Sequence, residues 1–211
     1  MTTDSTRARI LDCAESEFAQ NGFAGARTKS IALAADVNPA MIHYYFATKE
    51  GLFEAVLDRM ILELSEIVER LVPAPISMEA KLDAFLDGYF DYLVRHPNFT
   101  RLTKMSVGAT HNKRVEAWIE MFFRPLFEAG VAFLRQGMEA GRFRKVDAEQ
   151  YLVSFYCMTV SYFSDADMLS LLLRRDAMSP PAVDAHREAL KELFFHGLGA
   201  TRPTAPTSGH H

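Results

Sequence analysis

The sequence of 211 residues contains only two cysteines, no long apolar run and no secretion signal. Cys13 and Cys157 are too far apart for a CxxC motif, so we predict that both are buried apolar residues in a reducing compartment. The richest apolar stretch, residues 151–163, is interrupted by serine and threonine and is shorter than the roughly 18 residues that a membrane span needs. The first ten residues contain no apolar signal segment. These absences exclude a secreted disulfide scaffold and a membrane protein, and they predict a cytoplasmic globular protein.

Catalytic and metal-binding motifs are missing as well. The sequence contains no G-x-S-x-G, P-loop or H-E-x-x-H pattern, and no nucleophile lies at a recognisable spacing from a base. The scattered histidines His96, His111, His186 and His196 do not have the spacing of metal ligands. We therefore expect that the protein is not an enzyme and that it binds no cofactor or metal ion.

What is present is helical periodicity, with almost no strand alternation. Capping residues, prolines and glycines set the expected helix ends. Pro125 predicts a kink, and Ser164–Asp165 predicts an interruption. The expected helices cover residues 10–21, 28–35, 39–46, 48–71, 77–95, 99–107, 112–141, 147–173 and 179–197. The chain is therefore predicted to be all-α, with three small helices, a long connecting helix and a larger helical bundle.

The region from Thr28 to Phe46 reads as two short helices joined by a tight turn, which is the geometry of a helix-turn-helix. Asn38 predicts the start of the second helix, because its side chain caps free N–H groups and Pro39 suits the first helical position. Val37, Ile42 and Phe46 are spaced to face a small core. The outward side then carries Ala40, Met41, His43 and Tyr44, with Tyr45 at its edge. Such a row of ring side chains is typical of a surface that meets a nucleic acid, because His and Tyr donate to phosphates and pack on sugars.

The run VNPAMIHYYFATKEGLFEAVL resembles the helix-turn-helix and following helix of the tetracycline-repressor (TetR) family of transcriptional regulators. The resemblance covers about residues 7–57. It implies that Thr28 and Lys49 hold DNA phosphates and that the helix after the turn reads bases in the major groove. The complete predicted set of DNA-binding residues is Arg27, Thr28, Lys29, Asn38, Pro39, Ala40, Met41, His43, Tyr44, Tyr45 and Lys49.

Three residues depart from the usual pattern of that family. Asp36 replaces a glycine, and aspartate tolerates a left-handed turn better than most residues. Asn38 replaces serine or threonine and caps equally well, and His43 replaces a phosphate-binding tyrosine. Residues 21–49 contain three basic residues and one acidic residue, a net charge of +2. This small basic patch predicts few phosphate contacts per subunit and a shallow dependence of binding on salt.

The rest of the chain is rich in aromatic and methionine side chains, which suit an adaptable apolar pocket. The family resemblance implies that this part binds a small effector, and its composition favours a largely apolar or aromatic one. The predicted lining residues are Phe85, Tyr89, Trp118, Phe122, Tyr156 and Met158.

A single short recognition helix reads only a few base pairs, so two copies are needed to read a palindromic operator. Apolar stripes on the last two long helices predict the dimer interface. The resemblance implies that these helices form a four-helix interface with those of the partner. The predicted interface residues are Leu152, Phe155, Thr159, Phe163, Val183, Leu190, Leu193 and Phe194.

We therefore expect a helix-turn-helix DNA-binding domain in residues 1–47, a ligand-binding and dimerisation domain in residues 48–199, and a disordered tail in residues 200–211. The expected function is that of a homodimeric repressor, released from a palindromic operator when an effector tilts the helix that starts at Thr48. The alternative is a helical adaptor or lipid-binding module that uses the helix-turn-helix for protein contacts. A hydrolase ranks third. The sequence leaves open the effector, the operator and whether the ligand releases DNA or promotes binding.

Overall fold

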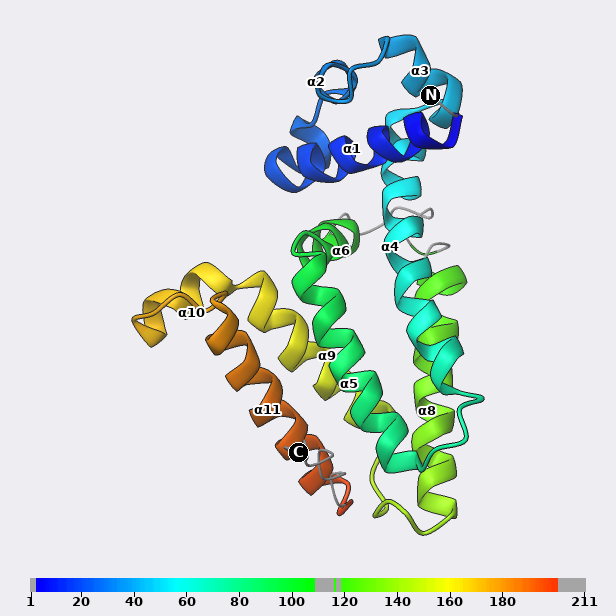
Figure 1. Cartoon of the computed structure of the whole chain (residues 1–211), viewed down its shortest axis with the longest axis vertical. Coiled ribbons are helices and arrows are strands. Elements are labelled where there is room, and N and C mark those ends of the chain that lie inside the picture. Colours follow the sequence, from blue (N-terminus) through cyan, green and yellow to red (C-terminus); the bar gives the residue numbers. More distant parts are fainter. Residues whose placement is uncertain (1–2, 109–115, 117–118, 201–211) are drawn as a thin grey trace, which may run out of the picture. The chain divides into compact units, whose positions relative to one another are not determined.

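A computed structural model describes residues 3–108, 116 and 119–200 (Figure 1), and all regular structure in these ranges is helical. The prediction of an all-α chain is confirmed. The helices are α1 (Thr3–Gly25), α2 (Thr28–Ala34), α3 (Pro39–Phe46), α4 (Lys49–Leu71), α5 (Met78–Arg95), α6 (Phe99–Gly108), a π-helix η1 (Ile119–Phe123), α8 (Arg124–Glu139), α9 (Ala148–Ser164), α10 (Ala166–Leu173) and α11 (Pro180–Gly197). None of these helices is long and apolar enough to cross a membrane.

The chain forms two compact units. The first contains residues 1–64 and 95–123, and the second contains residues 65–94 and 124–211. Helix α4 begins in the first unit and ends in the second. These units are defined by internal contacts, so the functional border predicted between residues 47 and 48 stays a prediction. Of the predicted tail, residues 201–211 lie outside the described residues.

Local sequence signals account for most helix ends. Gly22 has φ 70° and ψ 168° and breaks α1 where Asn21–Gly22 predicts an end. The Asp147 carboxylate accepts the backbone N–H groups of Glu149 and Gln150 and so caps α9. The predicted interruption near residues 164–165 is confirmed, because α9 ends at Ser164 and α10 begins at Ala166. At the position of the predicted kink, the π-helix η1 ends at Phe123 and α8 begins at Arg124, just before Pro125. Residues 112–115, 117 and 118 of the predicted helix lie outside the described residues.

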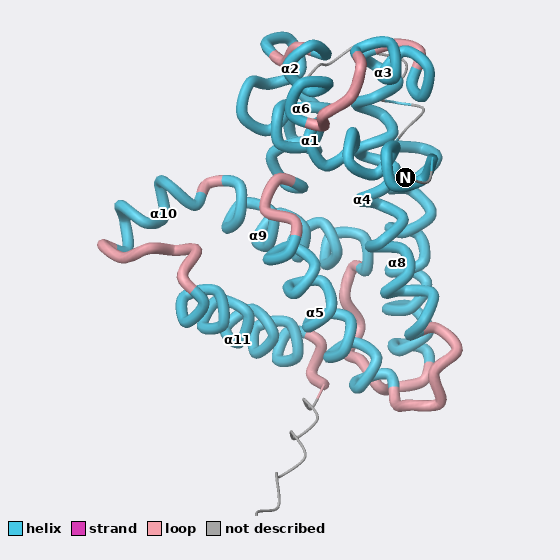
Figure 2. The backbone as a smooth tube through the Cα atoms, turned by 45° about the horizontal axis from the view of Figure 1, so that its top comes forward, coloured by secondary structure: helices cyan, strands magenta, loops and turns pink. Residues whose placement is uncertain are grey.

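The core of the first unit forms where α1, α2, α3 and the first half of α4 meet (Figure 2). Phe18 is fully buried, and the ring centre of Phe53 lies 4.9 Å from its ring and 5.3 Å from that of Phe23. Ile42 and Phe46 are buried as predicted, whereas Val37 is only half-buried. The two buried residues fix which side of α3 faces outward.

The core of the second unit forms between α5, α9 and α11. The ring of Phe155 lies 5.5 Å from that of Tyr89 on α5 and 5.0 Å from that of Phe194 on α11. Because α9 turns Phe155 inward, Cys157 faces outward two residues later and is exposed. The predicted burial of Cys157 is therefore wrong. Cys13 is half-buried, and this burial raises the pKa of its thiol.

Candidate nucleic-acid interface

The turn between α2 and α3 depends on a left-handed residue. Asp36 has φ 51°, as the sequence argument for this position requires. Its N–H donates to the carbonyl of Leu33, and the N–H of Val37 donates to that of Ala32 at 3.0 Å. These bonds close the end of α2 and reverse the chain within a few residues.

Asn38 and Pro39 start the recognition helix α3 as predicted. The Asn38 Oδ1 atom accepts the N–H of Ala40 at 2.9 Å, and Pro39 occupies the first helical turn. The side chain of Tyr44 is 75 % exposed, and its ring lies 5.1 Å from that of Tyr45, which is half-buried. The outward side of α3 therefore presents an aromatic surface, with Ala40 and His43 also exposed and Met41 half-buried.

His43 has a structural role that the sequence did not predict. Its Nδ1 atom lies 3.1 Å from the carbonyl oxygen of Ala47, which can only accept, so Nδ1 carries the proton and donates. Ala47 has φ 59° and ends the helix, and its N–H donates to the His43 carbonyl at 3.0 Å. His43 thus closes α3 on itself and has only Nε2 left to bond outside the protein.

Lys49 is held in place at the first turn of α4. Its Nζ atom donates to the carbonyl of Ala24 at 3.3 Å and lies 4.9 Å from the ring centre of Phe23. Gly51 is required nearby, because a Cβ atom there would lie 2.4 Å from the carbonyl oxygen of Phe46. The end of α3 therefore packs directly against the start of α4, which fixes Lys49 relative to the recognition helix.

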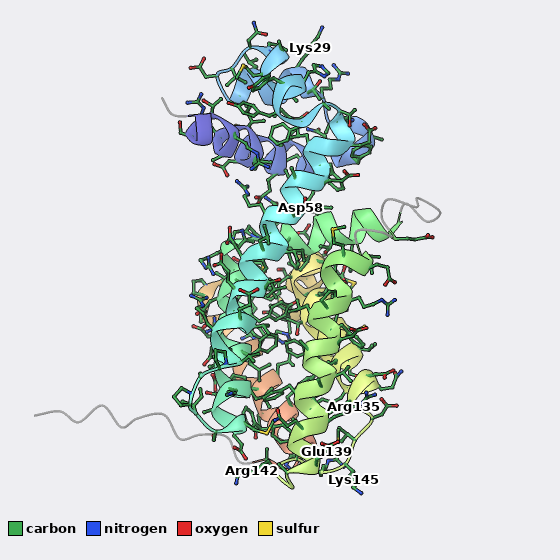
Figure 3. The ribbon with its side chains drawn as sticks, turned by 90° about the vertical axis from the view of Figure 1, so that its right-hand side faces the viewer. Lys29, Asp58, Arg135, Glu139, Arg142 and Lys145 are labelled. Carbon is green, nitrogen blue, oxygen red and sulfur yellow. The ribbon has the colours of Figure 1, made fainter. Side chains whose placement is uncertain are left out.

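The other predicted DNA-binding residues lie at the start of α2. Arg27 and Lys29 are exposed and Thr28 is half-buried. The backbone N–H of Arg27 donates to Glu17 Oε1 at 3.0 Å, which anchors this corner to α1. Figure 3 shows the Lys29 side chain at the outer edge of its unit. Both cationic side chains can therefore reach an external anion.

The predicted effector-binding residues fall into two groups. The ring centres of Phe85 and Tyr89 lie 5.9 Å apart in a stacked arrangement. Burial is the main cause that raises the pKa of the Tyr89 phenol, and the nearby Tyr156 is the second cause. Met158 is exposed, two residues and about 200° further around α9. Trp118 lies outside the described residues, as does the side chain of Phe122. The structure thus brings together Phe85, Tyr89 and Tyr156 and separates Met158 from them.

A hollow of about 540 Å³ lies on α11 and contains none of these residues. Its lining consists of Glu188, Ala189, Glu192, Phe195, His196 and Ala200. The described residues contain no group of three His, Cys, Asp or Glu side chains that could hold a metal ion.

The predicted dimer residues mostly pack within one subunit. Phe155, Thr159, Phe163, Val183, Leu190 and Phe194 are all buried in the single chain, and Leu152 is half-buried. Leu193 is 55 % exposed. The stripe that sequence reasoning assigned to a partner helix therefore forms the subunit's own core, because α11 turns it toward α5 and α9. The dimer interface itself stays a prediction, and of the predicted residues Leu193 and the half-buried Leu152 are the ones still accessible in the single chain.

Comparison with known proteins identifies the chain. A profile described as bacterial regulatory proteins of the tetR family matches residues 10–56, and one described as a tetracyclin repressor-like C-terminal domain matches residues 79–193. The chain belongs to the TetR family. The transcriptional repressor NicS of Pseudomonas putida is 30 % identical to this TetR-family protein over 92 % of this chain and 93 % of its own length. The repressor SCO4008 of Streptomyces coelicolor is 34 % identical over 47 % of this chain and 48 % of its own length.

Solved structures share the fold of this TetR-family protein. A TetR-like regulator from Rhodococcus sp. RHA1 superposes with a TM-score of 0.71 at 18 % identity, over 95 % of this chain and all of its own. FadR from Bacillus subtilis, solved in complex with stearoyl-CoA, also gives 0.71 at 18 % identity, over 90 % of this chain and 98 % of its own. The resemblance predicted from residues 7–57 is confirmed, and the protein is a DNA-binding transcriptional regulator.

Proposed function

We propose that this TetR-family protein is a homodimeric repressor that binds a palindromic operator in the cytoplasm and leaves it when a small, largely apolar effector binds the second unit. The observation that carries this proposal is the construction of α3. Its core side is buried through Ile42 and Phe46, while its opposite side exposes Ala40, His43 and Tyr44. No fold-stabilising role within the described chain accounts for a tyrosine that is three-quarters exposed.

The dimensions of α3 suit the major groove. Its eight residues are about 12 Å long, similar to the width of that groove. Ala40 and Met41 offer apolar contacts to thymine methyl groups, and the hydroxyls of Tyr44 and Tyr45 can donate to phosphates or base edges. Thr28, Arg27, Lys29 and Lys49 would bind the flanking phosphates. Asn38 and Pro39 act by fixing where the helix begins.

The proposed dimer interface uses the outer sides of α9, α10 and α11. Helix α10 has no buried residue in the single chain. Several exposed apolar side chains on neighbouring helices mark a protein interface more often than a solvated face. The exposed apolar side chains of these three helices are Val153, Tyr156, Met158, Met168, Leu171, Leu172, Leu173 and Leu193.

The proposed effector site lies at Tyr89. This side chain is only 5 % exposed, and its hydroxyl is a hydrogen-bond donor among largely apolar neighbours. A ligand acceptor atom placed against that hydroxyl would gain a hydrogen bond shielded from water. The neighbouring rings of Phe85 and Phe155 supply the apolar contacts. We therefore propose an effector with an aromatic or aliphatic body and one hydrogen-bond acceptor.

The direct test is selection of bound sequences from a random duplex pool with the full-length protein at fixed salt. A palindromic consensus is expected, and Tyr44→Ala should lose it whereas the exposed-face control Glu192→Ala should retain it. A single unrepeated half-site would contradict the dimer. Specific binding that survives both Tyr44→Ala and Lys49→Ala would contradict the proposed recognition surface and favour the adaptor interpretation.

A further inference from the structure

Arg7, near the start of α1, was not predicted to take part in DNA binding, yet its side chain lies against the recognition helix. Its guanidinium carbon is 5.5 Å from the ring centre of Phe46, the last residue of α3. Arg7 is exposed, and among the described residues it forms no ion pair and no hydrogen bond. The N–H donors of this cation are therefore available to an external acceptor.

Another cation of this unit, Arg59, behaves differently. Arg59 on α4 is paired with Asp12 at 2.6 Å and with Glu15 at 3.2 Å, so its charge is compensated within the unit. Arg7 has only an aromatic face beneath it. A ring holds a guanidinium in place without neutralising it or occupying its in-plane donors.

The contact with Phe46 also joins Arg7 to the aromatic surface of α3. The Phe46 ring lies 6.0 Å from that of Tyr45, which in turn lies 5.1 Å from that of Tyr44. Figure 1 shows the first turn of α1 close to α3 and to the start of α4. Arg7 therefore lies at one end of a row of rings whose other end is the exposed Tyr44 of the recognition helix.

Lys49 cannot serve the same phosphate. Lys49 lies against Phe23, near the C-terminal end of α1, whereas Arg7 lies in the first turns of that helix. The 14 helical steps from Arg7 to Asn21 correspond to about 21 Å of helix. The two cations thus approach the junction of α3 and α4 from opposite ends of α1.

We propose that Arg7 binds a backbone phosphate of the operator, as an anchor at the C-terminal end of the recognition helix that is separate from Lys49. This inference rests on the proposed operator binding by α3. A guanidinium makes two parallel hydrogen bonds to a phosphate, and Phe46 limits the freedom that Arg7 loses when it binds. Such a contact positions the protein on DNA without reading its sequence.

The test compares Arg7→Gln with the unaltered full-length protein on the selected operator and on a scrambled duplex, across a series of salt concentrations. Each phosphate contact contributes about 0.9 to the slope of log K against log salt. Loss of one phosphate contact in each of the two subunits should therefore lower the magnitude of the slope by about 1.8. Extrapolated from 1 M salt, the same relation predicts a loss of affinity of roughly 60-fold at 0.1 M salt, similar for both duplexes.

Two further variants separate this role from a purely structural one. Arg7→Lys keeps the charge and the contact with the ring, so it should retain the slope. Arg70→Gln removes an exposed arginine near the other end of α4 and should change nothing. If Arg7→Gln lowers the melting temperature and the affinity but leaves the slope unchanged, Arg7 only stabilises the fold and the inference is wrong. Failure of the unaltered protein to select any site would instead overturn the operator binding on which the inference rests.

Discussion

The turn between α2 and α3 and the packing of α9 against α11 represent two ways in which sequence determines structure. In the turn, each decisive interaction joins residues that are at most four or five positions apart, such as the Asn38 cap on Ala40 and the bond from Val37 to Ala32. In α9 and α11, the helix ends follow local signals, but local signals do not determine which helix or subunit covers each side of them. Local chemistry fixes the course of the backbone, whereas the partner of an apolar stripe depends on the whole unit.

The reason is that α9 and α11 are apolar on more than one side. Leu190 is buried while Leu193, less than one turn further along α11, is more than half exposed. An amphipathic pattern shows that a stripe will be covered, but a partner subunit and a neighbouring helix of the same subunit cover it equally well. This ambiguity makes the two leucines a matched pair.

The largest expected effect is on Leu190. Leu190→Ala should lower the free energy of unfolding by about 2–5 kcal/mol, because it leaves a cavity between α11 and the rest of its unit. Leu193→Ala should leave the stability of the monomer nearly unchanged and weaken dimerisation. Urea unfolding and sedimentation at several protein concentrations measure the two quantities. Equal losses of unfolding free energy at both positions would show that the two sides of α11 are not distinguished as described.

The next effect concerns a charge in the core. Lys191 is 1 % exposed, and its Nζ atom lies 2.8 Å from an Asp83 carboxylate oxygen and 2.7 Å from one of Asp87. Lys191→Ala would remove the buried cation that Asp83 and Asp87 share, although Arg187 stays 4.0 Å from Asp87. Because both carboxylates retain some contact with water, we expect a loss of about 3 kcal/mol, the lower part of the range for broken buried pairs.

Arg135 and Glu149, 2.9 Å apart and both largely exposed, provide the control for Lys191. Arg135→Ala should change the unfolding free energy by less than about 1 kcal/mol, because solvent screens an exposed pair. Figure 3 shows Arg135 near the end of its helix. A similar loss at both positions would mean that Lys191 contributes no more than a surface cation.

These two cases also define how far the sequence could predict this protein. The helix order, the caps at Asn38 and Asp147, the break at Gly22 and the left-handed Asp36 depend on residues within a few positions, and all were predictable. The buried Lys191 was not, because a lysine in a helix normally indicates a solvated face. Its partners lie more than 100 positions away on α5. The contacts of Lys49 with Ala24 and of Arg7 with Phe46 escaped prediction for the same reason.

A smaller effect is expected at the start of α3. Asn38→Ala should cost about 1 kcal/mol, the usual contribution of a helix cap, and should speed hydrogen exchange of the Ala40 amide about fivefold. Asn38→Ser should retain the cap and serves as the control. If the Ala40 amide exchanges equally fast in all three proteins, the tertiary contacts of Ile42 and Phe46, rather than the local cap, hold the helix start.

The smallest effect depends on pH and concerns the half-buried His186 of the second unit. Its ring stacks on that of Tyr162 at 3.8 Å, its Nε2 atom is buried without a partner, and burial lowers its pKa. Above about pH 6.5 the imidazole is neutral in both states and adds no penalty. As the pH falls through this value, the unfolded chain binds a proton that the folded protein resists, so stability declines until the lowered folded pKa is passed.

As the pH is lowered from 7 to 5, the urea midpoint should therefore decrease. His186→Phe should reduce that decline, while the exposed His196→Asn should not.

Glu79 titrates at lower pH, because its hydrogen bond with Arg142 lowers the pKa of its carboxyl. The stability that Glu79 contributes is lost only as the pH falls through that lowered value. A decline that persists unchanged in His186→Phe would place the responsible proton elsewhere. A decline that disappears would show that the His186 ring limits the free energy of unfolding in mild acid. This ring of α11 stacks on Tyr162 of α9, a helix pairing that the sequence did not specify.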